Sequence, residues 1–203
     1  MKWPLSSLAG FAVIILYCAF TFSSWALFSR AYNPVNNWLS DLGNSSSTYN
    51  PKGAILYNLG CILTGIALFP FFTGLYKWHI TEKWRKASLI LSQMIGCLAA
   101  FALIMIGVFS EDSGSPHTLW SDIFFLLNFL VLVLVGASLF THPRYMKIVA
   151  YYGFIVAAIN LALVFSSNTP LLEWFTVFTA LGYVGLMAGN MAKQPEFIEA
   201  THA

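Results

Sequence analysis

The chain has 203 residues, of which 58% are apolar and only 9% are charged, and its formal net charge is +2. Soluble domains carry about one quarter charged residues, so this composition excludes an ordinary soluble protein. Most of its surface must therefore be surrounded by lipid. We expect the protein to interact with membrane lipids and not with nucleic acid.

Six apolar runs are each long enough to cross the hydrocarbon core, which takes ~20 helical residues. None of them contains Lys or Arg. Long apolar runs separated by short polar breaks do not fit a membrane β-barrel, whose strands are ~10-residue alternating segments. The sequence therefore predicts an all-α fold, a single six-helix membrane domain over residues 1–203 with a cytoplasmic tail over 193–203. The predicted spans are residues 8–28, 54–76, 87–109, 118–141, 148–167 and 174–192.

The basic residues are divided unequally between the two ends of such a bundle. Eight of the ten fall on the side of the two termini, and Arg30 and Lys52 fall on the other. Loops that face the cytoplasm carry an excess of Lys and Arg. We therefore expect a multi-pass protein of the cytoplasmic membrane with both termini in the cytoplasm. The first run is too long for a signal peptide and has no clear cleavage site, so we expect it to remain a membrane helix.

The longest outer segment, residues 29–53, predicts a short amphipathic helix. Asn33 suits the cap, Pro34 suits the first helical position and Gly43 can end the helix. The apolar residues between them recur at helical spacing. These residues are Val35, Trp38, Leu39 and Leu42. We expect this helix at the outer membrane surface or over the mouth of the bundle.

Acidic residues gather on the outer side, together with His117. His117 and Ser121 are four residues apart and share a helix face. Asp122 is one step round the helix, and a carboxylate inside a span is costly unless it is paired or wetted, so we expect it to face the bundle interior. The sequence predicts an outward-facing binding site for a lipid headgroup or another amphiphile. Its predicted residues are Asp41, Glu111, Asp112, His117, Ser121 and Asp122.

The same residues allow two other interpretations, one structural and one catalytic. The side chains could form a structural polar network that locks the outer halves of the helices. A membrane hydrolase or lipid-modifying enzyme could combine Ser40 or Ser121 with His117 and with Asp41 or Asp122. No G-x-S-x-G motif marks a nucleophile, so the sequence favours binding over catalysis.

A metal site is a weaker alternative. It would combine His117 with Asp41 and Glu111 or Asp122, whereas catalytic zinc sites in hydrolases generally use more histidines. We expect neither a metal nor another cofactor.

The spans also carry signals for packing. Gly185 and Gly189 form a G-x-x-x-G pattern in the last run, which lets helix backbones approach closely. We expect this pattern to serve packing within the bundle, with a homodimer or a larger membrane complex as the alternative. The span centres hold amides but no charges, which disfavours a transporter.

Two sequence blocks resemble a known family. The first runs from Tyr32-Asn33-Pro34 through Ser40-Asp41-Leu42-Gly43 and Asn50-Pro51 to Asn58-Leu59-Gly60. The second is Gly107-x-Phe109-x-Glu111-Asp112, followed by His117 and Ser121, with Ser110 where proline would be expected. Together they resemble a prokaryotic family of six-helix membrane proteins catalogued as domain of unknown function 998.

This resemblance implies a six-span helical fold and no particular activity. It singles out Ser40, Asp41, Glu111, Asp112 and His117. A fainter resemblance to eukaryotic six-helix membrane families associated with lipid handling favours a lipid as the ligand.

Overall fold

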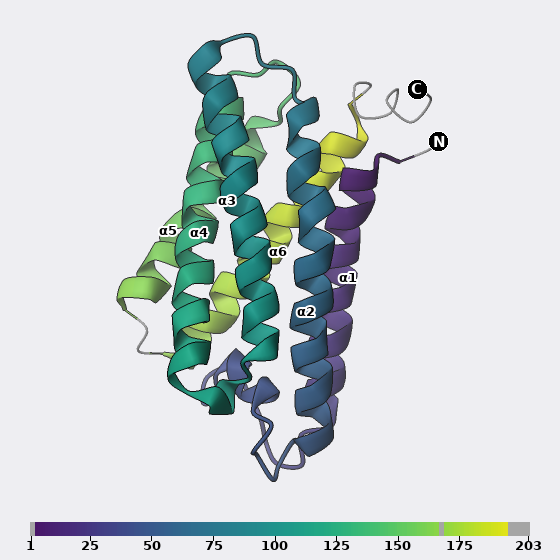
Figure 1. Ribbon diagram of the computed structural model, residues 1–203, viewed down its shortest axis with the longest axis vertical. Coiled ribbons are helices and arrows are strands. Elements are labelled where there is room, and N and C mark those ends of the chain that lie inside the picture. Colours follow the sequence, from purple (N-terminus) through teal and green to yellow (C-terminus); the bar gives the residue numbers. More distant parts are fainter. Residues whose placement is uncertain (1–2, 167–168, 195–203) are drawn as a thin grey trace.

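The computed structural model describes residues 3–166 and 169–194, and this part of the chain is helical with no strand (Figure 1). Each of its six long helices is long and apolar enough to cross a membrane. The predicted six-helix fold is confirmed, and the chain is a multi-pass membrane protein. The predicted tail lies outside the described residues beyond Gln194. The helices are α1 (Leu5–Ala26), α2 (Pro51–Thr73), α3 (Lys83–Val108), α4 (Ser115–Leu139), α5 (Lys147–Phe165) and α6 (Pro170–Ala192).

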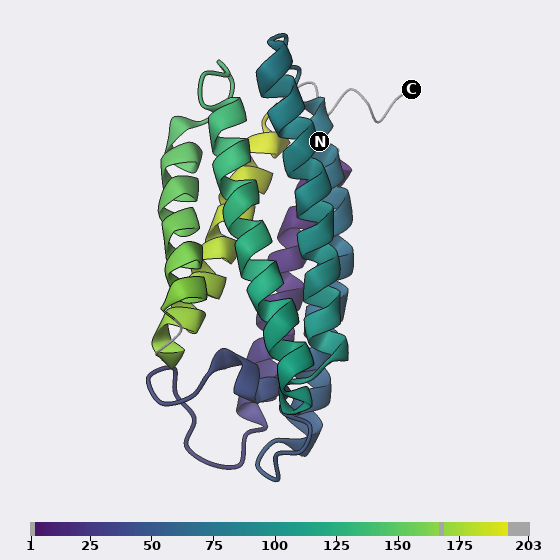
Figure 2. The same cartoon turned by 60° about the vertical axis from the view of Figure 1, so that its left-hand side comes forward.

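The six helices form a ring in chain order. Each helix packs against the next one in the sequence, and α6 closes the ring by packing against α1 (Figures 1 and 2). The start of α1 and the end of α6 lie at one end of the bundle, which we call the terminal end. Three short 3₁₀ helices complete the described fold: η1 (Leu39–Gly43), η2 (Gly74–Lys77) and η3 (Glu111–Ser113). We call the opposite end, where η1 and η3 lie, the η1 end.

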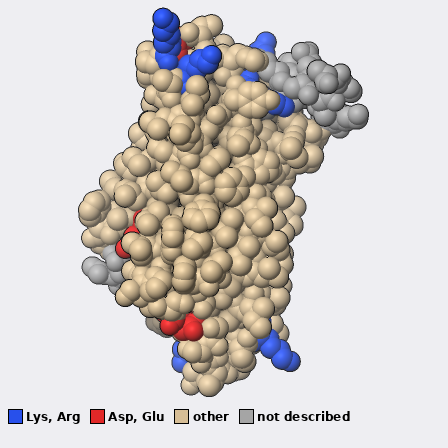
Figure 3. Space-filling view, in the orientation of Figure 1, with Lys and Arg blue, Asp and Glu red and all other residues tan. Residues whose placement is uncertain are grey.

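The surface of the ring suits a lipid environment. Large apolar side chains point outward all round it, among them Ile15, Ile66 and Phe165. Exposing so many apolar side chains to water would be unfavourable, whereas contact with the hydrocarbon of a bilayer is not. The side seen in Figure 3 is largely uncharged between its ends, and Lys and Arg gather mainly at the terminal end.

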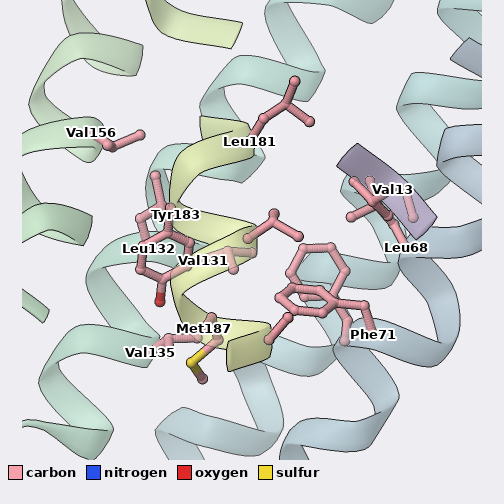
Figure 4. Close-up of a cluster of buried hydrophobic side chains, with 14 of the residues drawn as sticks. Val13, Leu68, Phe71, Val131, Leu132, Val135, Val156, Leu181, Tyr183 and Met187 are labelled. Carbon is pink, nitrogen blue, oxygen red and sulfur yellow. The ribbon is translucent and has the colours of Figure 1, made fainter. Parts of the chain in front are cut away.

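The interior holds a packed core and a cavity. Buried side chains from several helices fill the centre of the terminal half, including Phe71, Val131, Val135 and Met187 (Figure 4). Close helix contact supports this packing: a Cβ added at Gly65 of α2 would lie 2.7 Å from the carbonyl oxygen of Ala100 on α3. A cavity begins near the η1 end, and its lining reaches Leu68 and Phe72 near the end of α2.

The first loop differs from its predicted form. Asn33 caps a turn, since its Oδ1 accepts hydrogen bonds from the N–H groups of Val35 and Asn36, both at 3.1 Å. The chain is then extended at Trp38, and a separate 3₁₀ helix, η1, follows. The predicted continuous helix is wrong because Asp41 provides a second cap: its Oδ2 accepts the Trp38 N–H at 2.9 Å.

The apolar stripe predicted for this loop is accordingly split. Val35 is exposed, whereas Leu39 and Leu42 are completely buried. These two leucines anchor η1 against α1, α2 and α6. The segment therefore lies across one end of the ring, where it reaches the cavity.

Candidate functional site

The cavity lies inside the ring, and α1, α2, α3, α4, α6 and η1 contribute its lining. The space that the centre of a water molecule can occupy is about 70 Å³. One water needs ~10–15 Å³ on this measure, so the cavity has room for several waters or for part of a small molecule. From Glu173 to Val184 the lining follows α6 for about 16 Å at the usual helical rise. The cavity is therefore deep and narrow.

The lining changes character with depth. Polar side chains gather near the η1 end: Ser40, His117, Ser121 and Glu173. The deeper part is mainly apolar and includes Leu68, Phe72, Leu103 and Val184. A molecule with a polar end and an apolar body would match this gradient.

His117 is held in a fixed orientation at the polar end. It lies in the first turn of α4, directly after Pro116, and only 8% of its surface is exposed. Its Nδ1 lies 2.8 Å from the carbonyl oxygen of Phe109. A carbonyl only accepts hydrogen bonds, so Nδ1 carries the proton and Nε2 is left as an acceptor in the neutral ring.

Glu173 joins α6 to the first loop. Its carboxylate accepts hydrogen bonds from the N–H groups of Leu39 at 2.6 Å and Ser40 at 3.4 Å. Beside it, the indole N–H of Trp174 donates to the carbonyl oxygen of Asn37 at 3.0 Å. Glu173 was not among the predicted site residues, although a carboxylate in the first turn of a membrane helix is itself a signal of a polar site.

Three of the predicted acidic residues hold loops and do not line the cavity. Asp41 caps η1, and partial burial raises its pKa more than its hydrogen bonds from Trp38 and Asn37 lower it. Glu111 accepts a hydrogen bond from the side-chain amide of Asn44.

Asp112 fastens η3 to the first loop. Its Oδ1 accepts the N–H of Ser45 at 2.9 Å, and the Ser45 hydroxyl lies 2.9 Å from both carboxylate oxygens. Desolvation acts to raise the pKa of Asp112, but the hydrogen bonds from Ser45 and Ser110 outweigh it and hold that pKa below its ordinary value.

Asp122 does not face the bundle interior as expected. His117 and Ser121 both line the cavity, and Asp122, one step further round α4, is exposed on the outside of the ring. The structure thus brings Ser40, His117 and Ser121 to the cavity and leaves the acidic residues of the predicted site outside it. Within residues 3–166 and 169–194, no three His, Cys, Asp or Glu side chains are grouped so as to hold a metal ion.

Polar groups also occur deeper in the cavity, and among them only the amide of Asn128 belongs to the span-interior amides noted in the sequence. The hydroxyl oxygens of Tyr17 and Tyr57 lie 3.1 Å apart. Thr64 is 1% exposed, and its hydroxyl has no hydrogen-bond partner in the described structure. An unpaired buried hydroxyl beside a cavity is suited to a bound water or a ligand.

A family model described as "Protein of unknown function (DUF998)" matches residues 7–190. The chain belongs to this family. The match spans all six helices almost completely and includes every residue of the cavity lining. No curated protein and no solved structure matches the chain.

The residues that the family resemblance singled out divide into two groups in this DUF998 protein. Ser40 and His117 line the cavity. Asp41, Glu111 and Asp112 form the hydrogen bonds that shape the loops at the η1 end. The second group therefore positions the segment that carries Ser40 beside the segment that leads into His117.

Proposed function

We propose that this DUF998 protein binds one amphiphilic molecule through the cavity, which takes the polar group at the η1 end and the adjoining part of the apolar chain along the deeper lining. The observation that carries the proposal is the gradient from Ser40, His117, Ser121 and Glu173 to a mainly apolar deeper lining, inside a ring of membrane-spanning helices. The excess of Lys and Arg at the opposite end supports an outward orientation for this site.

The available partners indicate which headgroup fits. Glu173 supplies a carboxylate, His117 supplies Nε2 as an acceptor, and the two serine hydroxyls both donate and accept. None of the lining residues in the described part of the chain is Lys or Arg. Arg30 of the first loop is not part of the lining and stacks over the ring of Tyr49, 4.3 Å from its centroid. We therefore favour a headgroup that donates hydrogen bonds, such as a hydroxyl or an amine, over a phosphate.

Binding of defined amphiphiles to the purified protein tests this proposal. We would titrate monooleoylglycerol and oleylamine by native mass spectrometry, with oleoyl lysophosphatidic acid as the anionic comparison. We expect one molecule of the first two to bind more tightly than the anionic lipid. Equal or tighter binding of the anionic lipid would contradict the proposed headgroup class.

Two neighbouring substitutions on α4 give a matched test of the site. Ser121→Val removes a hydroxyl from the lining and should weaken binding roughly fivefold, the equivalent of one hydrogen bond worth ~1 kcal/mol. Asp122→Asn changes the exposed residue next to it and should leave binding unchanged. If both variants bind like the unmodified protein, the polar end of the cavity is not the headgroup site.

A second candidate function is hydrolysis of an ester or amide in the bound amphiphile. It is supported by His117, whose ring is oriented through Nδ1 so that Nε2 is the acceptor of the neutral ring, and by the two serines that line the same cavity. Neither Asp41 nor Asp122 lines the cavity, so the aspartate of the predicted triad has no counterpart there. Release of oleate from monooleoylglycerol, abolished in His117→Ala, would support hydrolysis, and intact substrate after prolonged incubation would contradict it.

A further inference from the structure

A second recess lies at the terminal end, between the start of α3 and the neighbouring ends of α4 and α5. It is an open recess and is separate from the central cavity. Arg85, in the first turn of α3, forms part of its wall together with aromatic and small side chains. The recess opens on the outside of the ring, where Trp84, Ala137 and Thr141 of its lining are exposed, and we call it the Arg85 groove.

Arg85 is a buried cation whose hydrogen bonds are incomplete. Only 8% of the residue is exposed. Its Nε donates to the carbonyl oxygen of Ser138 at 2.8 Å, and its Nη1 donates to Oε1 of Glu82 at 3.3 Å. Its Nη2 is buried and has no partner in the described structure. A guanidinium has five N–H donors in a planar fork, so one edge of the fork remains for an acceptor.

The missing acceptor is best supplied by an oxyanion. Guanidinium forks pair with phosphate or carboxylate through two parallel hydrogen bonds. Glu82 already places one carboxylate oxygen on Nη1, but its side chain is 55% exposed, so solvent or a ligand can displace it. No acidic side chain other than Glu82 lines the groove within the described residues.

The walls of the groove indicate that the anion belongs to a lipid. Ala137, Phe140 and Phe154 supply a mainly apolar surface next to the guanidinium. Trp84 at the rim is 61% exposed, and exposed indoles favour the depth of lipid headgroups. Lys147 lies near the same wall, with its Nζ 5.9 Å from the centroid of the Phe140 ring. A soluble phosphate would use the charge but leave the apolar walls without contact.

We propose that the Arg85 groove binds an anionic phospholipid from the leaflet at the terminal end. The phosphate accepts hydrogen bonds from Nη1 and Nη2 of Arg85, and an acyl chain lies against Phe140 and Phe154. This site is independent of the amphiphile cavity, since the two share no lining residue.

Lipid binding by variants of the intact protein tests this site. Delipidated protein would be titrated with phosphatidylglycerol and, separately, with phosphatidylcholine, and bound lipid would be counted by native mass spectrometry. We expect a phosphatidylglycerol site whose affinity falls at least tenfold in Arg85→Gln. Lys52→Gln, at the opposite end of the bundle, should bind like the unmodified protein. Equal binding by Arg85→Gln and the unmodified protein would overturn the proposal.

Two further variants keep the test valid if Arg85→Gln is unstable. Ala137→Phe fills the groove without removing any hydrogen bond of Arg85, and should abolish the site. Glu82→Gln removes the competing carboxylate charge and should tighten phosphatidylglycerol binding. Unchanged binding in both variants would overturn the proposal.

A last comparison separates a lipid from a free anion. Inorganic phosphate added in large excess should compete only weakly with phosphatidylglycerol, because it makes no contact with the apolar walls. Binding of inorganic phosphate that depends on Arg85, without any binding of phosphatidylglycerol, would show a site for a soluble anion and overturn the lipid assignment.

Discussion

Substitution of Glu173 tests how the first loop is held over the cavity. Glu173→Ala removes the acceptor of the 2.6 Å hydrogen bond from the N–H of Leu39, and Leu39 is completely buried. A buried N–H left without a partner costs about 1–3 kcal/mol. Taking ~2 kcal/mol, the equilibrium for release of η1 from α6 shifts roughly 30-fold. Glu173→Gln keeps a neutral acceptor, and neutral hydrogen bonds are about half as strong as charge-assisted ones, so its effect should be intermediate.

Hydrogen–deuterium exchange measures this release directly. The Leu39 and Ser40 amides should exchange fastest in Glu173→Ala, more slowly in Glu173→Gln and slowest in the unmodified protein, whereas amides in the middle of α3 should not change. Asp122→Asn, which alters an exposed acidic residue of α4, serves as the control. If Glu173→Ala leaves the exchange of η1 unchanged, packing of Leu39 and the Trp174–Asn37 hydrogen bond hold the loop, and the role assigned to Glu173 is wrong.

Two further predictions concern the loops and the helix packing. The pKa of Asp112 is lowered in the folded protein. The carboxylate therefore stabilises the fold above the ordinary aspartate pKa, and this stabilisation is lost as pH falls through the lowered value. Asp112→Asn should flatten this part of a profile of melting temperature against pH. An unchanged profile in Asp112→Asn would show that the hydrogen bonds between Asp112 and Ser45 do not contribute to stability. Gly65→Ala places a Cβ 2.7 Å from the carbonyl oxygen of Ala100 and should destabilise the bundle by about 1–3 kcal/mol, whereas Gly189→Ala meets nothing within 4 Å and should be tolerated. Thermal unfolding in detergent compares the two, and equal melting temperatures would contradict the close contact of α2 and α3.

The helical architecture was predictable because each span depends on local composition. A run of about 20 apolar residues without Lys or Arg must satisfy its own backbone hydrogen bonds in lipid, and this requirement selects a helix wherever it occurs. The Gly185–Gly189 pattern shows the limit of such local signals. Gly185 approaches Ile14 of α1 within the bundle, whereas a Cβ at Gly189 would meet nothing, so a partner at this surface stays a prediction.

The site was predictable only in part, because its geometry depends on contacts between distant segments. His117 and Ser121 lie on one helix face, and their spacing alone placed them together. Glu173 is 133 residues from Ser40, and no local pattern indicated that its carboxylate would bind η1. The orientation of Asp122 was wrong because a helix position one step from a polar face can still lie outside the ring, where rotation about the helix axis is set by packing against α3 and α5.

The first loop shows how two local signals compete. The spacing of its apolar residues fits a helix, but Asp41 caps a new turn at Trp38 and thereby ends the first one. A carboxylate three residues after Trp38 was visible in the sequence. Whether it would cap a new turn or face solvent depended on the burial of Leu39 and Leu42 against the bundle.

The amphiphile cavity is tested most directly by filling it. Ala180→Phe adds a ring to the lining of the cavity, and Ala137→Phe adds the same ring to the Arg85 groove. Native mass spectrometry of both variants with monooleoylglycerol compares the two positions under identical conditions. The account predicts that Ala180→Phe loses the single bound molecule while Ala137→Phe retains it. Retention of monooleoylglycerol by a folded Ala180→Phe protein would contradict the assignment of the cavity as the binding site.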